Sequence, residues 1–400
     1  MLIHWIWLAQ LPDVTLHQKL QLLQHFPDAE DLFFADDAKL SELEPKLRDA
    51  LSNKDLTEAR KIENKCLQRK IDLLPITDSA YPVRLRNIPD PPILLYCKGS
   101  LPDLTEKPII GIVGTRKATP YGIASTKKLS RQIAVCGGLV ISGGAAGIDT
   151  AAMQGAMETG NPVLCVLGCG VDVAYPVKNR QLFDQTAKNG CLISEYPPGD
   201  TPERWHFPQR NRIISGMANG VLVTEAPERS GALITARQAL EQGRDVFVIP
   251  GNIDVETSAG SNGLLQDGAA AVLSGWDVVK TYESQYPNTV ADRPLGLLQP
   301  EKPADIPKVA QAEKLPTDKK DIDILPKTSY IGKETNRQTL SAEEQQILDL
   351  LTEDPQSVDG VLARLDMPSA RALSLLTKLA LKGSVINHPG RLVSVRTGRK

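Results

Sequence analysis

The chain has 400 residues, of which 46 are lysine or arginine and 48 are aspartate or glutamate, so its formal net charge is −2. This length predicts about two or three domains. The near-neutral charge excludes a polycation, so any nucleic-acid binding must come from a local basic patch. Residues 1–9 are apolar, but they are too short for a membrane span and lack the basic start of a signal peptide. We therefore expect a cytoplasmic protein.

The six cysteines form no C-x-x-C pair, and no histidine stands at zinc-site spacing from them. Several of them lie inside apolar runs. We therefore expect free, buried thiols in a reducing compartment and no metal site.

Residues 1–75 are predicted to form a small helical domain. Leucines at positions 16, 20 and 23 recur at helical spacing, and prolines at positions 12, 27 and 45 separate short helices. Nothing in this region suggests catalysis. The prolines between residues 82 and 92 then force an extended backbone, and Ile93–Tyr96 is predicted to form an edge strand.

Residues 76–285 are predicted to form an α/β domain with a Rossmann-like, doubly wound and mostly parallel sheet. Continuous apolar runs are typical of strands that are buried on both faces. The expected strands are residues 109–113, 139–141, 163–167, 191–194, 221–224 and 246–249. The expected helices between them are residues 121–135, 148–158, 179–187, 210–218 and 230–242.

Residues 286–339 are rich in proline, lysine and aspartate and show no hydrophobic period, which predicts a disordered linker. Residues 340–397 are predicted to form a winged-helix-like domain. Its first helix would begin with a capping box of Ser341 and Glu344, and residues 383–395 would form a β-hairpin. Such modules bind DNA or proteins. The expected recognition helix has few cations, so the sequence does not decide between a DNA partner and a protein partner. These cations are Arg371, Lys378 and Lys382.

Two glycine-containing loops follow neighbouring strands of the predicted sheet. The first is Gly114-Thr115-Arg116, and the second runs from Ser142 to Gly147 with the sequence SGGAAG. Helix N-termini after such loops offer unpaired N–H groups, and glycines let an anionic oxygen approach the backbone. A phosphate-bearing ligand is therefore the first hypothesis. The alternative is that the glycines only permit tight turns and close packing of helices against strands.

The spacing of these loops disfavours two common phosphate ligands. Neither loop has the G-x-G-x-x-G pattern of a dinucleotide site or the G-K-[ST] end of a P-loop, so we expect no NAD, no ATP hydrolysis and no cofactor. Cations and aromatic rings instead recur after the strands, in residues 172–180, 205–212 and 225–235. This combination suits single-stranded nucleic acid, whose phosphates meet cations and whose bases stack on aromatic rings. The predicted nucleic-acid contacts are Gly114, Thr115, Arg116, Ser142, Gly143, Gly144, Gly147, Lys178, Arg180, Arg210, Asn211 and Arg212.

An enzyme is the competing hypothesis. Asp149, Glu195 and Glu225 each stand at an expected strand end or helix start, where an acid or base could act. The alternative for Asp149 is a helix cap. The alternative for the two glutamates is pairing with an arginine such as Arg210, Arg212 or Arg229.

Five stretches of the central region resemble the DprA/Smf family of DNA-processing proteins. They are VGTRKATPYG at 113–122, SGGAAGID at 142–149, FPQRNRIISG at 207–216, EAPERSGALITA at 225–236 and DVFVIPGNIDVETSAGSNGLLQDGA at 245–269. Together they cover most of the predicted central domain.

The resemblance implies a non-enzymatic mediator. Such a protein binds single-stranded DNA in a basic pocket, forms a homodimer, protects incoming DNA and loads the RecA recombinase during natural transformation. Arg116 falls on the family's pocket arginine, and Lys178 lies in the stretch that holds its pocket lysine. Residues 1–75 resemble the family's sterile-alpha-motif-like or helix-hairpin-helix domain, and the tail resembles its winged helix. A nucleotide-processing hydrolase remains the alternative, although the P-G-G-x-G-T-x-x-E signature of the phosphoribohydrolases does not occur.

Overall fold

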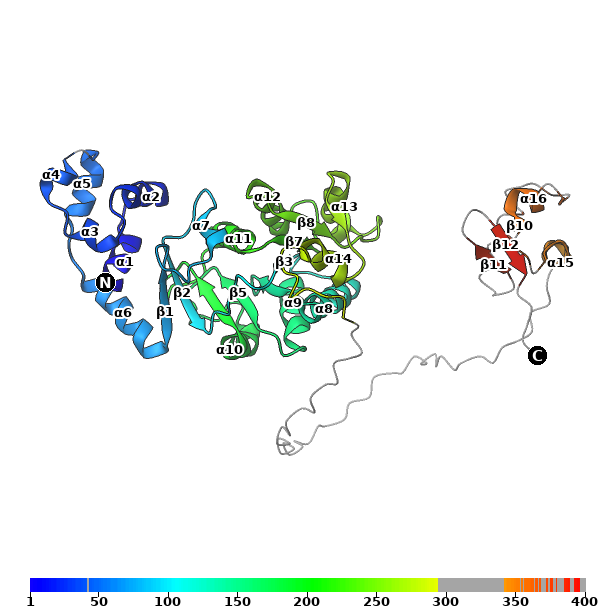
Figure 1. Cartoon of the computed structure of the whole chain (residues 1–400), viewed down its shortest axis with the longest axis horizontal. Coiled ribbons are helices and arrows are strands. Elements are labelled where there is room, and N and C mark those ends of the chain that lie inside the picture. Colours follow the sequence, from blue (N-terminus) through cyan, green and yellow to red (C-terminus); the bar gives the residue numbers. More distant parts are fainter. Residues whose placement is uncertain are drawn as a thin grey trace, which may run out of the picture. The chain divides into compact units, whose positions relative to one another are not determined.

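The computed structural model describes residues 1–293 except residue 42 and, nearer the C-terminus, residues 342–352, 354, 356–362, 364, 365, 367, 372, 375, 376, 379, 385–388 and 392–395. The chain divides into two units, Met1–Ile306 and Pro307–Lys400 (Figure 1). Each unit is described by itself. Every helix in the described residues is too short or too polar to cross a membrane.

The first unit begins with a series of short helices, as predicted. They are α1 (Leu2–Gln10), α2 (Leu16–His25), α3 (Ala29–Phe33), α4 (Asp37–Leu40), α5 (Pro45–Ser52) and α6 (Thr57–Arg69). Helix α2 begins at a capping box, in which the Thr15 hydroxyl accepts from the Gln18 N–H and the Gln18 side chain accepts from the Thr15 N–H. His4 is buried and stacks on Phe33 with 4.6 Å between ring centroids, so this histidine serves packing.

A sheet of nine strands follows within the described part of the first unit. Its strands are β1 (Ile71–Pro75), β2 (Leu94–Gly99), β3 (Ile109–Val113), β4 (Leu139–Ser142), β5 (Val163–Leu167), β6 (Cys191–Ser194), β7 (Gly220–Val223), β8 (Asp245–Val248) and β9 (Ala270–Ala271). Their order is β1-β2-β6-β5-β4-β3-β7-β8-β9. The pairs from β6 to β9 are all parallel, whereas β2 is antiparallel to both β1 and β6. The predicted α/β class and mostly parallel sheet are confirmed.

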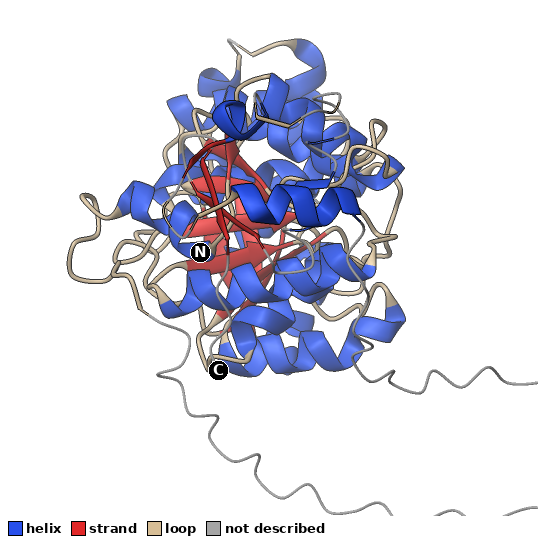
Figure 2. Ribbon diagram, turned by 90° about the vertical axis from the view of Figure 1, so that its right-hand side faces the viewer, coloured by secondary structure: helices blue, strands red, loops and turns tan. Residues whose placement is uncertain are grey.

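Helices cover both faces of this sheet (Figure 2). They are α7 (Val83–Arg86), α8 (Pro120–Val135), α9 (Ile148–Met157), α10 (Arg180–Asn189), α11 (His206–Met217), α12 (Gly231–Glu241), α13 (Glu256–Gln266) and α14 (Gly275–Val279), with the 3-10 turns η1 (Val177–Asn179) and η2 (Lys280–Tyr282). Alternate residues of β3 pack into two separate cores. Ile110 and Ile112 share one core with residues of α8, α9 and α10, and Ile109 and Val113 share the other with residues of α11 and α12. Burial on both faces is why the strands are continuous apolar runs.

The strand order reverses beside β3. The chain passes from β3 to β4 on one side, and β7 pairs with β3 on the other side. In an open α/β sheet such a switch point leaves a crevice beyond the carboxyl ends of the strands. The loops that follow β3 and β7 therefore border the place where a ligand is expected.

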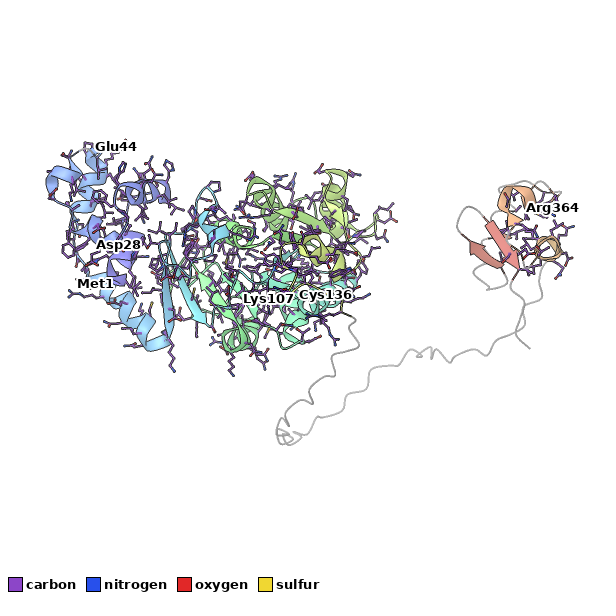
Figure 3. The ribbon with its side chains drawn as sticks, in the orientation of Figure 1. Met1, Asp28, Glu44, Lys107, Cys136 and Arg364 are labelled. Carbon is purple, nitrogen blue, oxygen red and sulfur yellow. The ribbon has the colours of Figure 1, made fainter. Side chains whose placement is uncertain are left out.

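The extended backbone predicted after Pro82 is wrong, because Val83–Arg86 forms helix α7. Three predicted boundaries are also wrong. Strand β2 is not at the edge, because β1 pairs along it, and β1 lies within the predicted helical region 1–75. Helix α11 begins four residues earlier than predicted, since Pro208 lies in the first turn, where a missing N–H costs little. Residues 286–293 pack on the first unit, where Val290 is buried and Ala291 donates to the carbonyl of Cys136. Figure 3 labels Cys136 among the side chains of this unit. The remaining residues of the predicted linker, 294–339, lie outside the described residues.

The second unit contains α15 (Ala342–Leu350), β10 (Gln356–Ser357), α16 (Val358–Leu362), β11 (Val385–His388) and β12 (Leu392–Val395). Strands β11 and β12 form the predicted hairpin, and β10, which was not predicted, pairs with β12. Ile347, Val361, Leu379 and Val393 form part of its core. The side chains of the predicted capping box and the cations Arg371, Lys378 and Lys382 lie outside the described residues.

Candidate nucleic-acid interface

A cleft of about 680 Å³ opens at the switch point of the sheet. Its walls include the loop after β3, the loop after β7, the first turns of α11 and α12, Ala145 of the second glycine loop, Asp149 and Tyr175. Gly114, Thr115 and Arg116 line it, together with Arg210 and Asn211. The structure therefore brings the first glycine loop and the beginning of α11 to one place.

Glu225 holds the two strand-end loops together. Its backbone carbonyl accepts from the Thr115 N–H at 2.7 Å. Its buried carboxylate accepts from the backbone N–H of Thr119 at 2.9 Å and from the Thr119 hydroxyl. Thr119 in turn caps α8 by accepting from the Gly122 N–H at 3.1 Å. Glu225 thus sets the position of the loop that carries Arg116.

Arg116 is exposed and lies over an aromatic ring of α11. Its guanidinium carbon is 5.2 Å from the ring centroid of Phe207. Tyr175, 39% exposed, contacts Phe207 with 5.5 Å between ring centroids. Both rings line the cleft, so a cation and two ring faces converge there. Trp205, which was also expected in this group, is exposed but lies outside the lining and packs edge-on against His206.

Two further arginines line the cleft although they were not among the predicted contacts. Arg204 precedes α11 and Arg229 follows β7, and both are exposed. In the described residues, neither they nor Arg116 forms an ion pair with a carboxylate. The sequence could have indicated Arg229, because it follows β7 in the same way that Arg116 follows β3.

Lys178 and Arg180 are exposed at η1 and the start of α10, outside the lining of the cleft. Asn179 between them is buried and donates to the carbonyl of Gly144 at 2.9 Å and to the hydroxyl of Thr150 at 2.8 Å. The segment that carries these two cations is therefore tied to the second glycine loop, and neither cation lines the cleft with Arg116.

The second glycine loop is packed inside the domain. The buried Ser142 hydroxyl donates to the Ile112 carbonyl at 2.7 Å, so the group that we expected to face a phosphate is used in the core. A side chain at Gly143 would meet Arg210, and one at Gly144 would meet Phe183. At the start of α9, Ile148 donates to the Thr115 carbonyl at 3.2 Å. The alternative interpretation, in which these glycines permit close packing, explains the loop.

Gly147 joins the two glycine loops. Its φ of +82° favours glycine, and a side chain there would meet the carbonyl oxygens of Thr115 and Arg116. The position of the Arg116 loop thus depends on the glycine at 147.

Arg210 and Asp149 line the cleft but are buried. The Arg210 guanidinium is buried and donates to the carbonyls of Gly143, at 2.6 Å, and Val166. Burial lowers the pKa of Arg210 and raises the pKa of Asp149, and the attraction between their opposite charges opposes both shifts. The Asp149 carboxylate also accepts from the Ala145 N–H at 3.3 Å. Arg210, expected to neutralise a phosphate, is therefore committed to backbone carbonyls.

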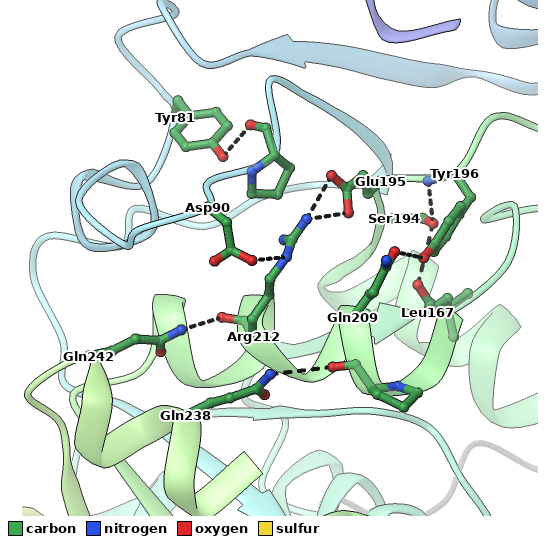
Figure 4. A network of polar contacts seen from close by, with 12 residues as sticks. Tyr81, Asp90, Leu167, Ser194, Glu195, Tyr196, Gln209, Arg212, Gln238 and Gln242 are labelled. Carbon is green, nitrogen blue, oxygen red and sulfur yellow. Dashed lines mark hydrogen bonds and ion pairs between the residues drawn. The ribbon is translucent and has the colours of Figure 1, made fainter. Parts of the chain in front are cut away.

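Arg212 lies away from the cleft, in the network of Figure 4. Its terminal nitrogen contacts both carboxylate oxygens of Glu195 at 2.7 and 2.8 Å, and its Nε lies 3.1 Å from Asp90 Oδ2. The predicted pairing of Glu195 with an arginine is confirmed. The expected phosphate contact of Arg212 is not compatible with this position, because its side chain is buried and already paired.

We expect Arg212→Ala to destabilise the fold and to leave nucleic-acid affinity within about twofold. Removal of the arginine leaves Glu195 without its partner, and breaking such a pair costs about 2–4 kcal/mol where the carboxylates keep some solvent contact. Urea unfolding followed by circular dichroism, with anisotropy of a labelled oligonucleotide, measures both effects. A tenfold loss of nucleic-acid affinity in the folded variant would show that Arg212 contacts the nucleic acid.

The loop that carries Tyr175 is anchored by a residue that the sequence analysis missed. The side chain of Asp172 is almost fully buried, pairs with Arg69 of α6 and accepts from the Gly199 N–H at 2.8 Å. Its partners lie far away in the sequence, so no local pattern indicates this role. All six cysteines are buried and free, and the described residues contain no group of three side chains that could hold a metal ion.

Comparison with known proteins identifies the family. Residues 72–283 match DNA recombination-mediator protein A, and residues 332–391 match the DprA winged helix domain. The chain is 42% identical over 211 residues to the DNA processing protein DprA of Bacillus subtilis, covering 53% of this chain and 71% of that protein. It is 38% identical over 278 residues to the Smf protein of Synechocystis, covering 68% and 70%.

Two solved structures agree with these matches. DprA of Streptococcus pneumoniae superposes with a TM-score of 0.61 and 36% identity, over 70% of this chain and 97% of that one. DprA of Helicobacter pylori, described for its single-stranded DNA binding mode, superposes with a TM-score of 0.50 and 30% identity, over 54% and 97%. The chain therefore belongs to the DNA recombination-mediator protein A family, the DprA/Smf proteins.

Proposed function

We propose that the chain binds single-stranded DNA in the cleft at the switch point of its sheet. The observation that carries this proposal is the position of the Arg116 guanidinium over Phe207, whose ring also contacts Tyr175. Arg204 and Arg229 line the same cleft, and neither pairs with a carboxylate of the described residues. Single strands meet proteins through the same two elements, cations for the phosphates and ring faces for the bases. The Helicobacter pylori relative, which binds single-stranded DNA, supports the assignment.

We assign the DNA contacts to the residues of the site whose side chains are exposed. Arg116, Arg204 and Arg229 would neutralise phosphates inside the cleft, while Lys178 and Arg180 would extend the path along α10. Gly114 and Thr115 would hold the backbone that presents Arg116, and Asn211 would shape the wall by donating to the Gly231 carbonyl. The buried residues Ser142, Gly143, Gly144, Arg210 and Arg212 and the half-buried Gly147 would support the site without touching DNA.

The wider role is that of a recombination mediator. Membership of the family supports a cytoplasmic homodimer that protects incoming DNA and loads RecA during natural transformation. Loading is tested by RecA ATPase activity on DNA coated with single-strand-binding protein, where the chain should shorten the lag; an unchanged lag would remove this part of the proposal. Sedimentation equilibrium tests the dimer.

The expected affinity depends steeply on salt. Neutralisation of phosphates by the five exposed cations gives a slope of log K against log salt of about −0.7 for each contact, hence at most about −3.5. Anisotropy of a labelled single-stranded oligonucleotide at 50 and 200 mM salt, with duplex DNA as competitor, measures this slope. Binding that is insensitive to salt, or that duplex displaces as well as single strand does, would contradict the proposal.

A nucleotide-processing hydrolase is less well supported. The three acid or base candidates have structural partners. Glu195 pairs with Arg212, and Glu225 accepts hydrogen bonds from Thr119. The buried Asp149 carboxylate accepts a hydrogen bond from the Ala145 N–H. This supports a non-enzymatic function. Release of a free base from a nucleoside monophosphate would revive the enzyme hypothesis.

A further inference from the structure

A second cavity, of about 780 Å³, lies at the opposite edge of the sheet from the DNA cleft. Ile109, the first residue of β3, lines it, as do Met217 at the end of α11 and Arg244 immediately before β8. The amino ends of the strands therefore border this cavity, whereas their carboxyl ends border the DNA cleft. We call it the amino-edge cavity.

Hydrogen-bond donors converge in the amino-edge cavity. Arg84 of α7 donates to the Tyr286 hydroxyl oxygen at 3.1 Å, and Asn219 donates to the same oxygen at 3.2 Å. A hydroxyl oxygen that accepts twice has its own proton left to donate. Arg244 donates to the carbonyls of Arg84 and Gly216, and its buried Nε has no partner among the described residues. Two guanidinium groups and the Tyr286 hydroxyl group therefore line the cavity.

These donors have no anionic partner in the described residues. Among the residues that the structure describes, neither Arg84 nor Arg244 forms an ion pair. The one carboxylate of the lining, Asp103, accepts from the N–H and the hydroxyl of Thr105 at 2.8 and 2.6 Å. Burial and, secondly, the nearby charge of Arg84 lower the pKa of Arg244. Two like charges held together without a counter-charge would be relieved by a bound anion.

The rest of the lining indicates what the uncharged part of such an anion is. Tyr81, Pro82, Leu101, Leu104 and Met217 supply apolar walls. A volume of about 780 Å³ exceeds what an inorganic ion fills and falls in the range of small-molecule sites. The ligand should therefore carry an apolar or aromatic body beside its charge.

We propose that the amino-edge cavity binds a phosphate monoester on an aromatic body, with a nucleoside monophosphate as the class that fits. Arginine forks match phosphate oxygens in bidentate geometry. Two guanidinium groups and the Tyr286 hydroxyl suit the three terminal oxygens of a phosphate better than the two of a carboxylate. This site is independent of the DNA cleft and gives the chain a second, small-molecule ligand.

Isothermal titration calorimetry of the full chain with deoxyadenosine monophosphate tests the proposal, with inorganic phosphate and deoxyadenosine as the other arms. We expect the monophosphate to bind at least tenfold more tightly than either. Arg84→Gln and Tyr286→Phe should each weaken it about tenfold, and Arg116→Ala should leave it unchanged. The conservative Tyr286→Phe keeps the ring in place, and thermal melting confirms that each variant is folded.

Three results would overturn the proposal. The first is no heat of binding up to about 10 mM monophosphate. The second is binding that Arg116→Ala abolishes while Arg84→Gln leaves it intact, because the probe would then occupy the DNA cleft. The third is an affinity for inorganic phosphate equal to that for the monophosphate, which would show that the apolar walls bind no part of the ligand.

Discussion

Replacing Arg116 with alanine is expected to weaken single-stranded DNA binding by at least about tenfold, equally for all sequences. The residue supplies a phosphate contact, and a hydrogen bond to a charged group is among the stronger polar contacts. It also covers the face of Phe207 at 5.2 Å, so its removal disturbs the place where a base would stack. The salt slope should fall by about 0.7 as one contact is lost. Fluorescence anisotropy at several salt concentrations measures both quantities.

Lys117 provides the matched control. It is exposed, carries the same charge and is the next residue, but it does not line the cleft. Lys117→Ala should change affinity by less than about threefold, and Arg116→Lys should recover only part of the loss, because an ammonium lacks the planar face that lies over the ring. Equal losses in Arg116→Ala and Lys117→Ala would show that only net charge matters.

Replacing Gly147 with alanine is expected to destabilise the first unit by about 2–5 kcal/mol. A positive φ costs an ordinary residue at least 1–2 kcal/mol, roughly its cost in the left-handed helical region, and overpacking adds about 1–3 kcal/mol. Both apply here, since φ is +82° and the new methyl group would meet the carbonyls of Thr115 and Arg116. Urea unfolding followed by circular dichroism measures the loss. The Arg116 loop should shift with it, so DNA affinity should fall although Gly147 touches no DNA.

Gly160→Ala separates the two causes. Gly160 has a similar φ of +75°, but nothing lies within 4 Å of an added side chain. This variant should lose only the backbone cost of about 1–2 kcal/mol and keep its DNA affinity. If both variants lost the same stability, close packing between the glycine loops would not be the reason for the glycine at 147.

The parallel strands could be predicted because burial on both faces requires continuous apolar runs. Val163–Leu167 is such a run, and it became β5 within the predicted bounds. Strand β1 escaped prediction because Asp72 in it is exposed and the strand follows directly after Lys70, which ends α6 in a left-handed conformation. Its identity as a strand depends on pairing with β2, which is a contact distant in sequence.

The candidate site could be predicted only in part. Arg116 and the ring of Phe207 come from the motifs themselves, and the structure brings them together. Arg210 and Arg212 look equivalent in the sequence, yet residues two apart on a helix point to nearly opposite sides. The partners that bury Arg212, Asp90 and Glu195, lie on distant segments, so spacing alone could not distinguish a phosphate contact from a structural ion pair.

Photocrosslinking tests most directly whether single-stranded DNA lies in the cleft at the switch point. An oligonucleotide with 5-iodouracil at successive positions would be irradiated with the full chain, and the adducts located by mass spectrometry. We predict adducts on Tyr175 and Phe207, whose rings line the cleft, and their loss in Arg116→Ala. Adducts confined to residues 342–395 or to the amino-edge cavity, with none on these two rings, would contradict the account.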